Sequence, residues 1–226
     1  MSQESELRVD FREQLAEVDG RLSELIHLVR VAIAEATEAL LREDDAAAVA
    51  ITSRKHLADP LYKEVEDQVG ALMARQGPVA SDLQYLLTVL RAVPELEQSA
   101  ELAATIARRG SQGLVSVLSP RARSIVTRTG DVVTAMWAEL DRRWALHEAA
   151  ADEPLDGALE ELHDLHMSLT AEVAAGGLPA SATMDMALIG RFFERLGDHA
   201  VNIIERLDRL NFRPLPPRPH DGDAGA

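Results

Sequence analysis

Apolar residues recur at helical spacing along this chain, and this periodicity restricts its possible folds more than any other pattern in the sequence. Through residues 183–210 the large apolar side chains recur at alternating steps of three and four, which places them on one face of a helix. A strand would instead alternate with a period of two. We therefore predict a long amphipathic helix whose apolar face packs in a helical bundle. The residues of this face are Met186, Ile189, Phe193, Leu196, Ala200, Ile203, Leu207 and Leu210.

Helical periodicity extends over most of the chain and is interrupted at a few defined places. The acidic pair Asp44 and Asp45 interrupts the first helical stretch. Gly77 and Pro78 end the second, because proline has no backbone N–H to donate and glycine suits a helix cap. Only 4% of the residues are aromatic, which favours helix over strand. An all-α fold of six long helices is predicted, covering residues 11–43, 46–74, 81–109 with a bend at Pro94, 120–151, 154–173 and 183–210.

Composition excludes several classes of function. A net charge of −15 repels the phosphate backbone, so no nucleic-acid partner is expected. The absence of cysteine rules out disulfides and thiolate metal sites. No G-x-S-x-G turn, phosphate-binding glycine loop or dinucleotide fingerprint is present, so we expect no enzyme. The charged N-terminal residues do not resemble a signal peptide, and no window approaches the roughly 18 apolar residues of a membrane span, so a cytoplasmic protein is expected.

An internal repeat is indicated by carboxylates that recur at a constant spacing of 97 residues. Apolar pairs share this spacing but carry less weight, because any two helical halves share some apolar positions through periodicity alone. The carboxylate pairs are Asp59 with Asp156, Glu97 with Glu194, and Glu101 with Asp198, and the apolar pairs include Leu40 with Trp137, Leu72 with Leu169, and Ile106 with Ile203.

The repeat predicts the domain organisation. We expect two tandem, sequence-related three-helix bundles, residues 1–110 and 111–210, with the boundary near 110–119. Residues 211–226 form a Pro-rich polar tail, which is expected to be disordered or polyproline-like.

Four carboxylates in the second half form a candidate metal site. Asp152 and Asp156 lie four residues apart, as do Glu194 and Asp198, so each pair projects from one face of its helix. Like charges at this spacing destabilise a helix by about 0.2–0.5 kcal/mol per pair, and a bound cation would compensate. Two such pairs on neighbouring helices offer hard oxygen ligands to Mg, Mn, Ca or iron. The alternative from spacing alone is a solvated acidic face with neighbouring arginines as counterions.

A longer motif surrounds the second of these pairs. The string Phe-Glu-Arg-Leu-Gly-Asp-His-Ala-Val-Asn-Ile, residues 193–203, closely resembles the motif that ends each repeat of the PhoU family. Residues 77–83, Gly-Pro-Val-Ala-Ser-Asp-Leu, resemble that family's sequence at the start of its third helix, and residues 188–195 are similar to actinobacterial members. The resemblance covers about residues 11–210.

The resemblance implies two three-helix bundles whose acidic motifs, on the second and third helix of each, hold metal ions. Carried over residue by residue, the metal ligands of the second bundle are Asp152, Asp156, Glu194 and Asp198, with Fe, Mn, Mg or Zn as the metal. The first bundle keeps only Asp59, Glu97 and Glu101. Four other positions of the first bundle depart from the pattern, so a weakened or lost metal site is expected there. Lys55 corresponds to Asp152, Gln98 to Arg195, Ala100 to Gly197 and Thr105 to Asn202.

The resemblance also implies a function. The protein would restrain phosphate uptake and the phosphate-starvation response through contacts with the ATPase subunit of a phosphate ABC transporter and with a sensor histidine kinase. It would act as a homodimer, peripheral to these membrane complexes. The alternatives are a metal-free helical adaptor and a ferritin-like di-metal oxidase, the latter because Glu24 to His27 and Glu160 to His163 have Glu-x-x-His spacing.

Two residues of the motif have predicted packing roles. Gly197 costs about 1 kcal/mol relative to alanine inside a helix, so we expect a neighbouring backbone to approach closely there. His199 is expected to be solvated, with an auxiliary ligand role as the alternative.

Overall fold

The computed structural model describes residues 3–78, 80–110, 112–146 and 155–210. Within these residues the chain forms six α-helices, one short 3-10 helix and no strand, so the predicted all-α fold is confirmed. The elements are α1 (Gln3–Arg42), α2 (Asp45–Gln76), α3 (Ala80–Gly110), η1 (Val115–Val117), α4 (Pro120–Leu146), α5 (Asp156–Ala174) and α6 (Ala180–Arg209).

The helix ends mostly follow the local sequence. Asp44 caps the N-terminus of α2, where its carboxylate accepts a hydrogen bond of 2.9 Å from the backbone N–H of Ala47. Gly77 ends α2 with a φ of 52°, a left-handed conformation that glycine adopts without strain. α1 begins earlier than predicted, at Gln3. The predicted end of the fourth helix at residue 151 and the predicted tail 211–226 lie outside the described residues.

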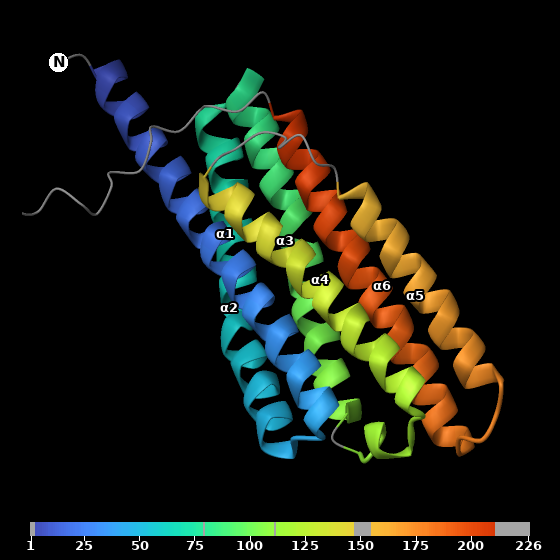
Figure 1. Ribbon diagram of the computed structural model, residues 1–226. Coiled ribbons are helices and arrows are strands. Elements are labelled where there is room, and N and C mark those ends of the chain that lie inside the picture. The colour runs from blue at the N-terminus through green and yellow to red at the C-terminus, as the bar shows by residue number, and fades with distance from the viewer. Residues whose placement is uncertain (1–2, 79, 111, 147–154, 211–226) are drawn as a thin grey trace, which may run out of the picture.

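The six helices form two three-helix bundles that pack side by side. α1, α2 and α3 pack against one another, as do α4, α5 and α6. The bundles meet where α1 packs on α4 and α3 packs on α6. As a consequence α2 and α5 lie at opposite outer edges, with the other four helices between them (Figure 1). One hydrophobic core runs through both bundles, and its largest fully buried side chains include Trp137, Trp144, Tyr85 and Phe193.

The apolar residues that the repeat pairs at a spacing of 97 all lie in the core. Leu40 of α1 and Trp137 of α4 are fully buried. The same holds for the pairs on the second and third helices of the bundles, Leu72 with Leu169 and Ile106 with Ile203, which are at most 2% exposed.

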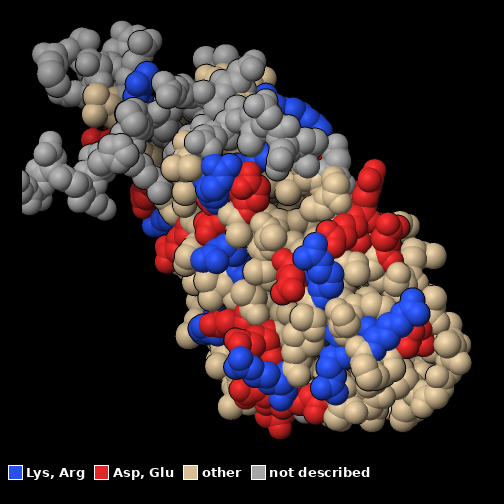
Figure 2. All heavy atoms as spheres, viewed as in Figure 1, with Lys and Arg blue, Asp and Glu red and all other residues tan. Residues whose placement is uncertain are grey.

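Charges of both signs cover the surface. On the face shown in Figure 2, basic and acidic side chains are interspersed, and acidic side chains gather at the upper right, where α5 begins. In the part of the chain that the structure describes, no helix is both long and apolar enough to cross a bilayer.

Candidate functional site

A groove between α5 and α6 contains two of the four carboxylates predicted for the second bundle. Its volume is about 630 Å³. Glu194 and Asp198, one turn apart on α6, line one side of the groove, and polar residues of α5 line the other. The groove is lined by Leu159, Glu160, Leu162, His163, Asp164, Glu194 and Asp198.

Glu194 is the most enclosed carboxylate of this groove, with 13% of its side chain exposed. Nδ1 of His163 lies 3.4 Å from one of its oxygens, and Nε2 of His166 lies 3.6 Å from the other. Arg191 donates a hydrogen bond of 2.8 Å to the second oxygen. The Glu194 carboxylate thus lies close to two imidazoles and a guanidinium. The two imidazoles belong to α5, so the carboxylate faces that helix.

Asp198 differs from Glu194 in being exposed to solvent. Among the described residues it has no hydrogen-bond or ion-pair partner, although it shares the groove with Glu194. Its oxygens are therefore open to a ligand from solution.

The other two predicted ligands cannot be placed in this groove. Asp152 lies outside the described residues. Asp156 is the first residue of α5, but its side chain is also outside the described part. The described side chains contain no group of three or more His, Asp or Glu residues arranged to hold a metal ion. The predicted set of four ligands therefore stays a prediction, with Glu194 and Asp198 located.

In the first bundle, the predicted acidic residues lie around a lysine. Lys55 of α2 forms ion pairs with Asp59 on its own helix and with Glu101 on α3. Glu97 lies one turn before Glu101 and is exposed. The carboxylates of the first bundle thus surround a cation that belongs to the chain itself.

Comparisons with known proteins agree with this architecture. A family model described as PhoU domain matches residues 22–110. The phosphate-specific transport system accessory protein PhoU homolog 2 of Mycobacterium tuberculosis is 28% identical over 207 residues, covering 89% of this chain and 96% of that protein. An uncharacterized protein of Deinococcus radiodurans is 32% identical over 167 residues, covering 70% of this chain and 71% of its own length.

Solved structures extend the match to both bundles. The crystal structure of PhoU from Pseudomonas aeruginosa superposes with a TM-score of 0.81 at 25% identity, covering 88% of this chain and 98% of that one. The chain belongs to the PhoU family. PhoU from Streptococcus pneumoniae shares the fold, with a TM-score of 0.76 at 23% identity over 88% of this chain and 96% of that one.

Gly197 of the PhoU motif allows a close approach, but by a side chain. A Cβ at this position would lie 2.3 Å from Cδ2 of Leu162 on α5. The predicted approach of a neighbouring backbone is therefore replaced by a leucine methyl group that packs directly on the helix. This contact lies beside the groove that Leu162 also lines.

His199 of the same motif is buried, so the prediction that it is solvated is wrong. Its exposed fraction is 8%, and its Nδ1 lies 2.8 Å from the hydroxyl oxygen of Ser99 on α3. Burial lowers the pKa of His199 from its ordinary value. The periodicity of α6 alone could not reveal this, because His199 is covered by the other bundle.

The two histidines beside Glu194 extend the site beyond the predicted carboxylates. The sequence indicates a metal-binding role for His163 only through its Glu-x-x-His spacing from Glu160, and it predicts no role for His166. Both lie three residues apart on α5 and face the same carboxylate of α6. A spacing of three residues places both histidines on one face of a helix, and this spacing could have indicated the pair from the sequence.

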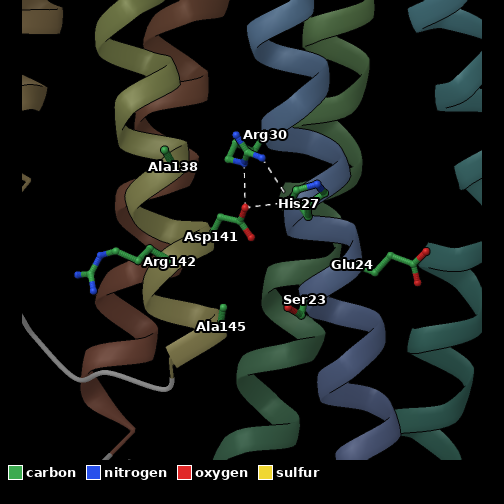
Figure 3. Close-up of a pocket in the computed structure, with 8 residues that line it drawn as sticks. All are labelled: Ser23, Glu24, His27, Arg30, Ala138, Asp141, Arg142 and Ala145. Carbon is green, nitrogen blue, oxygen red and sulfur yellow. Dashed lines mark hydrogen bonds and ion pairs between the residues drawn. The ribbon is translucent and has the colours of Figure 1, made fainter. Parts of the chain in front are cut away.

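A second groove, between α1 and α4, has a volume of about 580 Å³. In Figure 3, Asp141 of α4 points toward Arg30 and His27 of α1. Its oxygen accepts a hydrogen bond of 2.8 Å from Nε of Arg30 and lies 3.1 Å from Nδ1 of His27. Glu24 and Arg142 point away from this cluster (Figure 3). The charges of Arg30 and Asp141 therefore neutralise one another, and their hydrogen bond connects the two bundles.

The two Glu-x-x-His sequences lie in separate grooves. Glu24 and His27 line the groove between α1 and α4, whereas Glu160 and His163 line the groove between α5 and α6. A ferritin-like di-metal centre needs both motifs around one core. The arrangement gives this alternative no support.

Proposed function

We propose that this protein is an accessory regulator of a phosphate-specific transport system. The observation that carries the proposal is the match to the M. tuberculosis accessory proteins, which extends over 89% of this chain. The protein restrains phosphate uptake and the phosphate-starvation response by binding the ATPase subunit of the transporter and a sensor histidine kinase. It acts as a binding protein in the cytoplasm and catalyses no reaction.

The groove between α5 and α6 is the surface on which we expect this regulation to depend. It lies beside α5, an outer helix of the molecule, so a partner can approach it without disturbing the core (Figure 1). Its open Asp198 and oriented Glu194 offer negative charge at a fixed position. Such a surface favours a cation or a basic partner.

A metal ion in this groove is the second part of the proposal. Glu194 and Asp198 would hold it, joined by Asp152 and Asp156. Carboxylate oxygens suit Mg and Mn, and the imidazoles of His163 and His166 extend the range to iron and Zn. When bound, the metal would neutralise the acidic pair on α6 and supply open coordination positions for phosphate or a partner's carboxylate.

Phosphate uptake in the organism that encodes the protein tests the regulatory function. Deletion of the gene should raise uptake of radiolabelled phosphate and induce a phosphate-starvation reporter in phosphate-rich medium. Wild-type protein should reverse both effects, whereas a Glu194→Ala, Asp198→Ala variant should not. The matched control, Glu66→Ala with Glu205→Ala, removes two exposed carboxylates elsewhere and should complement fully. Unchanged uptake and reporter levels in the deletion strain would refute the proposal.

Elemental analysis of the purified, untagged protein tests the metal. About one metal site per chain, absent from the Glu194→Ala, Asp198→Ala variant and present in the Glu66→Ala, Glu205→Ala control, is the expected result. One observation favours the metal-free adaptor as the second candidate, because Arg191 already supplies Glu194 with a cation at 2.8 Å. No metal after supplying Mn, Fe or Zn would select that alternative.

We also propose a homodimer in solution. Large apolar side chains are exposed on the outer helix α2, with Val49 at 66% and Leu57 at 78%, and a second copy packed there would cover them. Light scattering should then give twice the chain mass of 24.6 kDa. A mass of one chain at micromolar concentration would argue against the dimer.

A further inference from the structure

An ammonium group lies between α2 and α3 of the first bundle. Nζ of Lys55 is 3.2 Å from Oδ1 of Asp59 and 3.1 Å from Oε2 of Glu101. Only 14% of the Lys55 side chain is exposed, so the protein covers most of its surface. Two of the three acidic residues that the repeat preserves in this bundle therefore share a cation that the chain itself supplies.

Two further side chains lie close to these carboxylates. Arg108 lies 3.2 Å from the other oxygen of Glu101, and Nδ1 of His56 lies 3.3 Å from Asp59. Burial alone would raise the pKa of Glu101, but hydrogen bonds from Lys55 and Arg108 lower it. Burial likewise acts to lower the pKa of Lys55, and its bonds to Glu101 and Asp59 raise it. Lys55 and Glu101 are therefore both charged at neutral pH.

This arrangement does not fit the metal that the PhoU family implies for its acidic motifs. A cation bound to both Asp59 and Glu101 would take the place in which the Lys55 ammonium lies. Lysine has no lone pair to offer while it is protonated, and its positive charge repels a metal ion at short range. At the spacing of 97 residues, the second bundle has Asp152 where the first has Lys55. The two bundles thus differ by a charge reversal at a position where the second bundle has a predicted metal ligand.

We propose that Lys55 is the resident cation of the first bundle and excludes metal from it. The ammonium links α2 to α3 by bridging Asp59 and Glu101, so this helix pair keeps its geometry whatever the metal supply. Any response of the protein to metal is then confined to the second bundle. This last consequence rests on the proposed metal site at Glu194 and Asp198, whereas the exclusion of metal from the first bundle does not.

Metal content of the full-length chain tests the exclusion. Wild type, a Lys55→Glu variant and a Lys63→Glu variant are loaded with Mn²⁺ or Zn²⁺, desalted and analysed for metal per chain. Lys63→Glu is the matched control, because it reverses an exposed charge on the same helix. Lys55→Glu should hold about one ion more than wild type, and Lys63→Glu should hold no more. A folded Lys55→Glu protein with no additional ion would overturn the proposal.

A second pair of variants tests the wild-type bundle directly. Asp59→Asn with Glu101→Gln should leave the metal content of wild type unchanged, and should abolish the additional ion when combined with Lys55→Glu. Loss of metal from the otherwise wild-type chain would show that the first bundle holds a cation despite Lys55, which contradicts the proposal. Circular dichroism establishes that each variant is folded.

The outcomes separate this inference from the proposed site in the second bundle. A wild-type protein without metal would contradict the site at Glu194 and Asp198. The gain of one ion by Lys55→Glu would still support the role of Lys55. The thermal midpoint gives an independent readout, because chelator should lower it in Lys55→Glu by removing the first-bundle ion, whereas Lys63→Glu should match wild type.

Discussion

Arg195 of α6 donates a hydrogen bond of 3.0 Å to the side-chain oxygen of Gln98 on α3, and the two residues occupy the same position in the two repeats. Equivalent residues can meet only near an axis that relates their repeats. Arg30 of α1 also donates a hydrogen bond of 2.8 Å to Asp141 of α4, where the first helices of the two repeats pack against each other. An approximate twofold axis therefore passes between α1 and α4 and between α3 and α6.

The repeats have diverged in their chemistry across this axis. Arg206 donates hydrogen bonds of 2.8 Å from both Nη atoms to Glu95. At the spacing of 97 residues, Arg109 corresponds to Arg206 and Phe192 corresponds to Glu95. The guanidinium of Arg109 lies over the Phe192 ring, 5.9 Å from the ring centroid. The geometry of the interface is retained while a charged pair in one half is a cation–π contact in the other.

The ion pair of Glu95 and Arg206 should contribute measurably to stability. Both side chains are largely covered, with 18% and 24% exposed, so removing one leaves the other without its partner. Arg206→Met should lower the free energy of unfolding by about 1–3 kcal/mol in urea titrations. Arg209→Met on the same helix is the control, because Arg209 is 73% exposed and its pair with Glu205 should contribute less than about 1 kcal/mol. Equal effects of the two substitutions would contradict the expectation.

Gly130 allows α4 to approach α1 closely. A Cβ at this position would lie 2.2 Å from Cγ2 of Thr37. Gly130→Ala should therefore lower the free energy of unfolding by about 1–3 kcal/mol through overpacking. Adding Thr37→Ser, which removes Cγ2, should recover part of this loss. Gly70→Ala in α2 meets no atom within 4 Å and should instead gain about 0.5–1 kcal/mol from helix propensity. A stabilised Gly130→Ala protein would refute the close approach.

Glu139 should make the fold sensitive to acid. A hydrogen bond from Arg142, supported by Arg143, holds the pKa of Glu139 at about 2, below its ordinary value of 4.5. Because the folded-state pKa is depressed, the stabilisation is present above pH 4.5 and is lost as the pH falls toward 2. Thermal midpoints measured from pH 5 to pH 3 should fall less steeply in Glu139→Gln than in wild type. Glu66→Gln, which replaces an exposed carboxylate, should follow the wild-type curve.

His199 should also make the fold less stable as the pH falls, but at a higher pH than Glu139 does. Burial lowers its pKa from the ordinary value of 6.5, so the unfolded chain binds a proton more readily than the folded one. The stability contributed by neutral His199 is present above pH 6.5 and is lost as the pH falls through the lower folded-state pKa. The thermal midpoint should therefore drop between pH 7.5 and pH 5.5 by less in His199→Asn than in wild type. The control His56→Asn replaces a histidine whose side chain is 67% exposed. If His56→Asn reduced the fall in thermal midpoint as much as His199→Asn does, the pH dependence could not be attributed to the buried His199.

Much of the fold was predictable because helix formation depends on local sequence. The apolar stripe of α6, the cap residue Asp44 and the terminator Gly77 each act within a few residues of chain. Their effects on a helix do not require knowledge of its neighbours. The contact of Arg30 on α1 with Asp141 on α4 was not predictable in the same way, because it depends on how the two bundles pack against each other.

The candidate site divides in a similar manner. The helical repeat places Glu194 and Asp198 on one face of α6, and the structure puts both in the groove. The imidazoles of His163 and His166 reach Glu194 only because of the rotation of α5 about its axis. Lys55 was expected to disturb the first motif, but its contact with Glu101 of α3 depends on how α2 packs against that helix.

The six helices, the duplicated plan and the charge reversal at Lys55 could be predicted without a structure, since they follow from residue type and spacing along one chain. Three other features depend on how the helices pack. These are the burial of His199 under α3, the contact of Arg195 with Gln98, and the bridging of Asp59 and Glu101 by Lys55. The physical reason is that helical periodicity specifies which residues share a face. The residues of neighbouring helices that this face contacts depend on the rotation and register of the packed helices. Rotation and register are set by side-chain packing throughout the shared core.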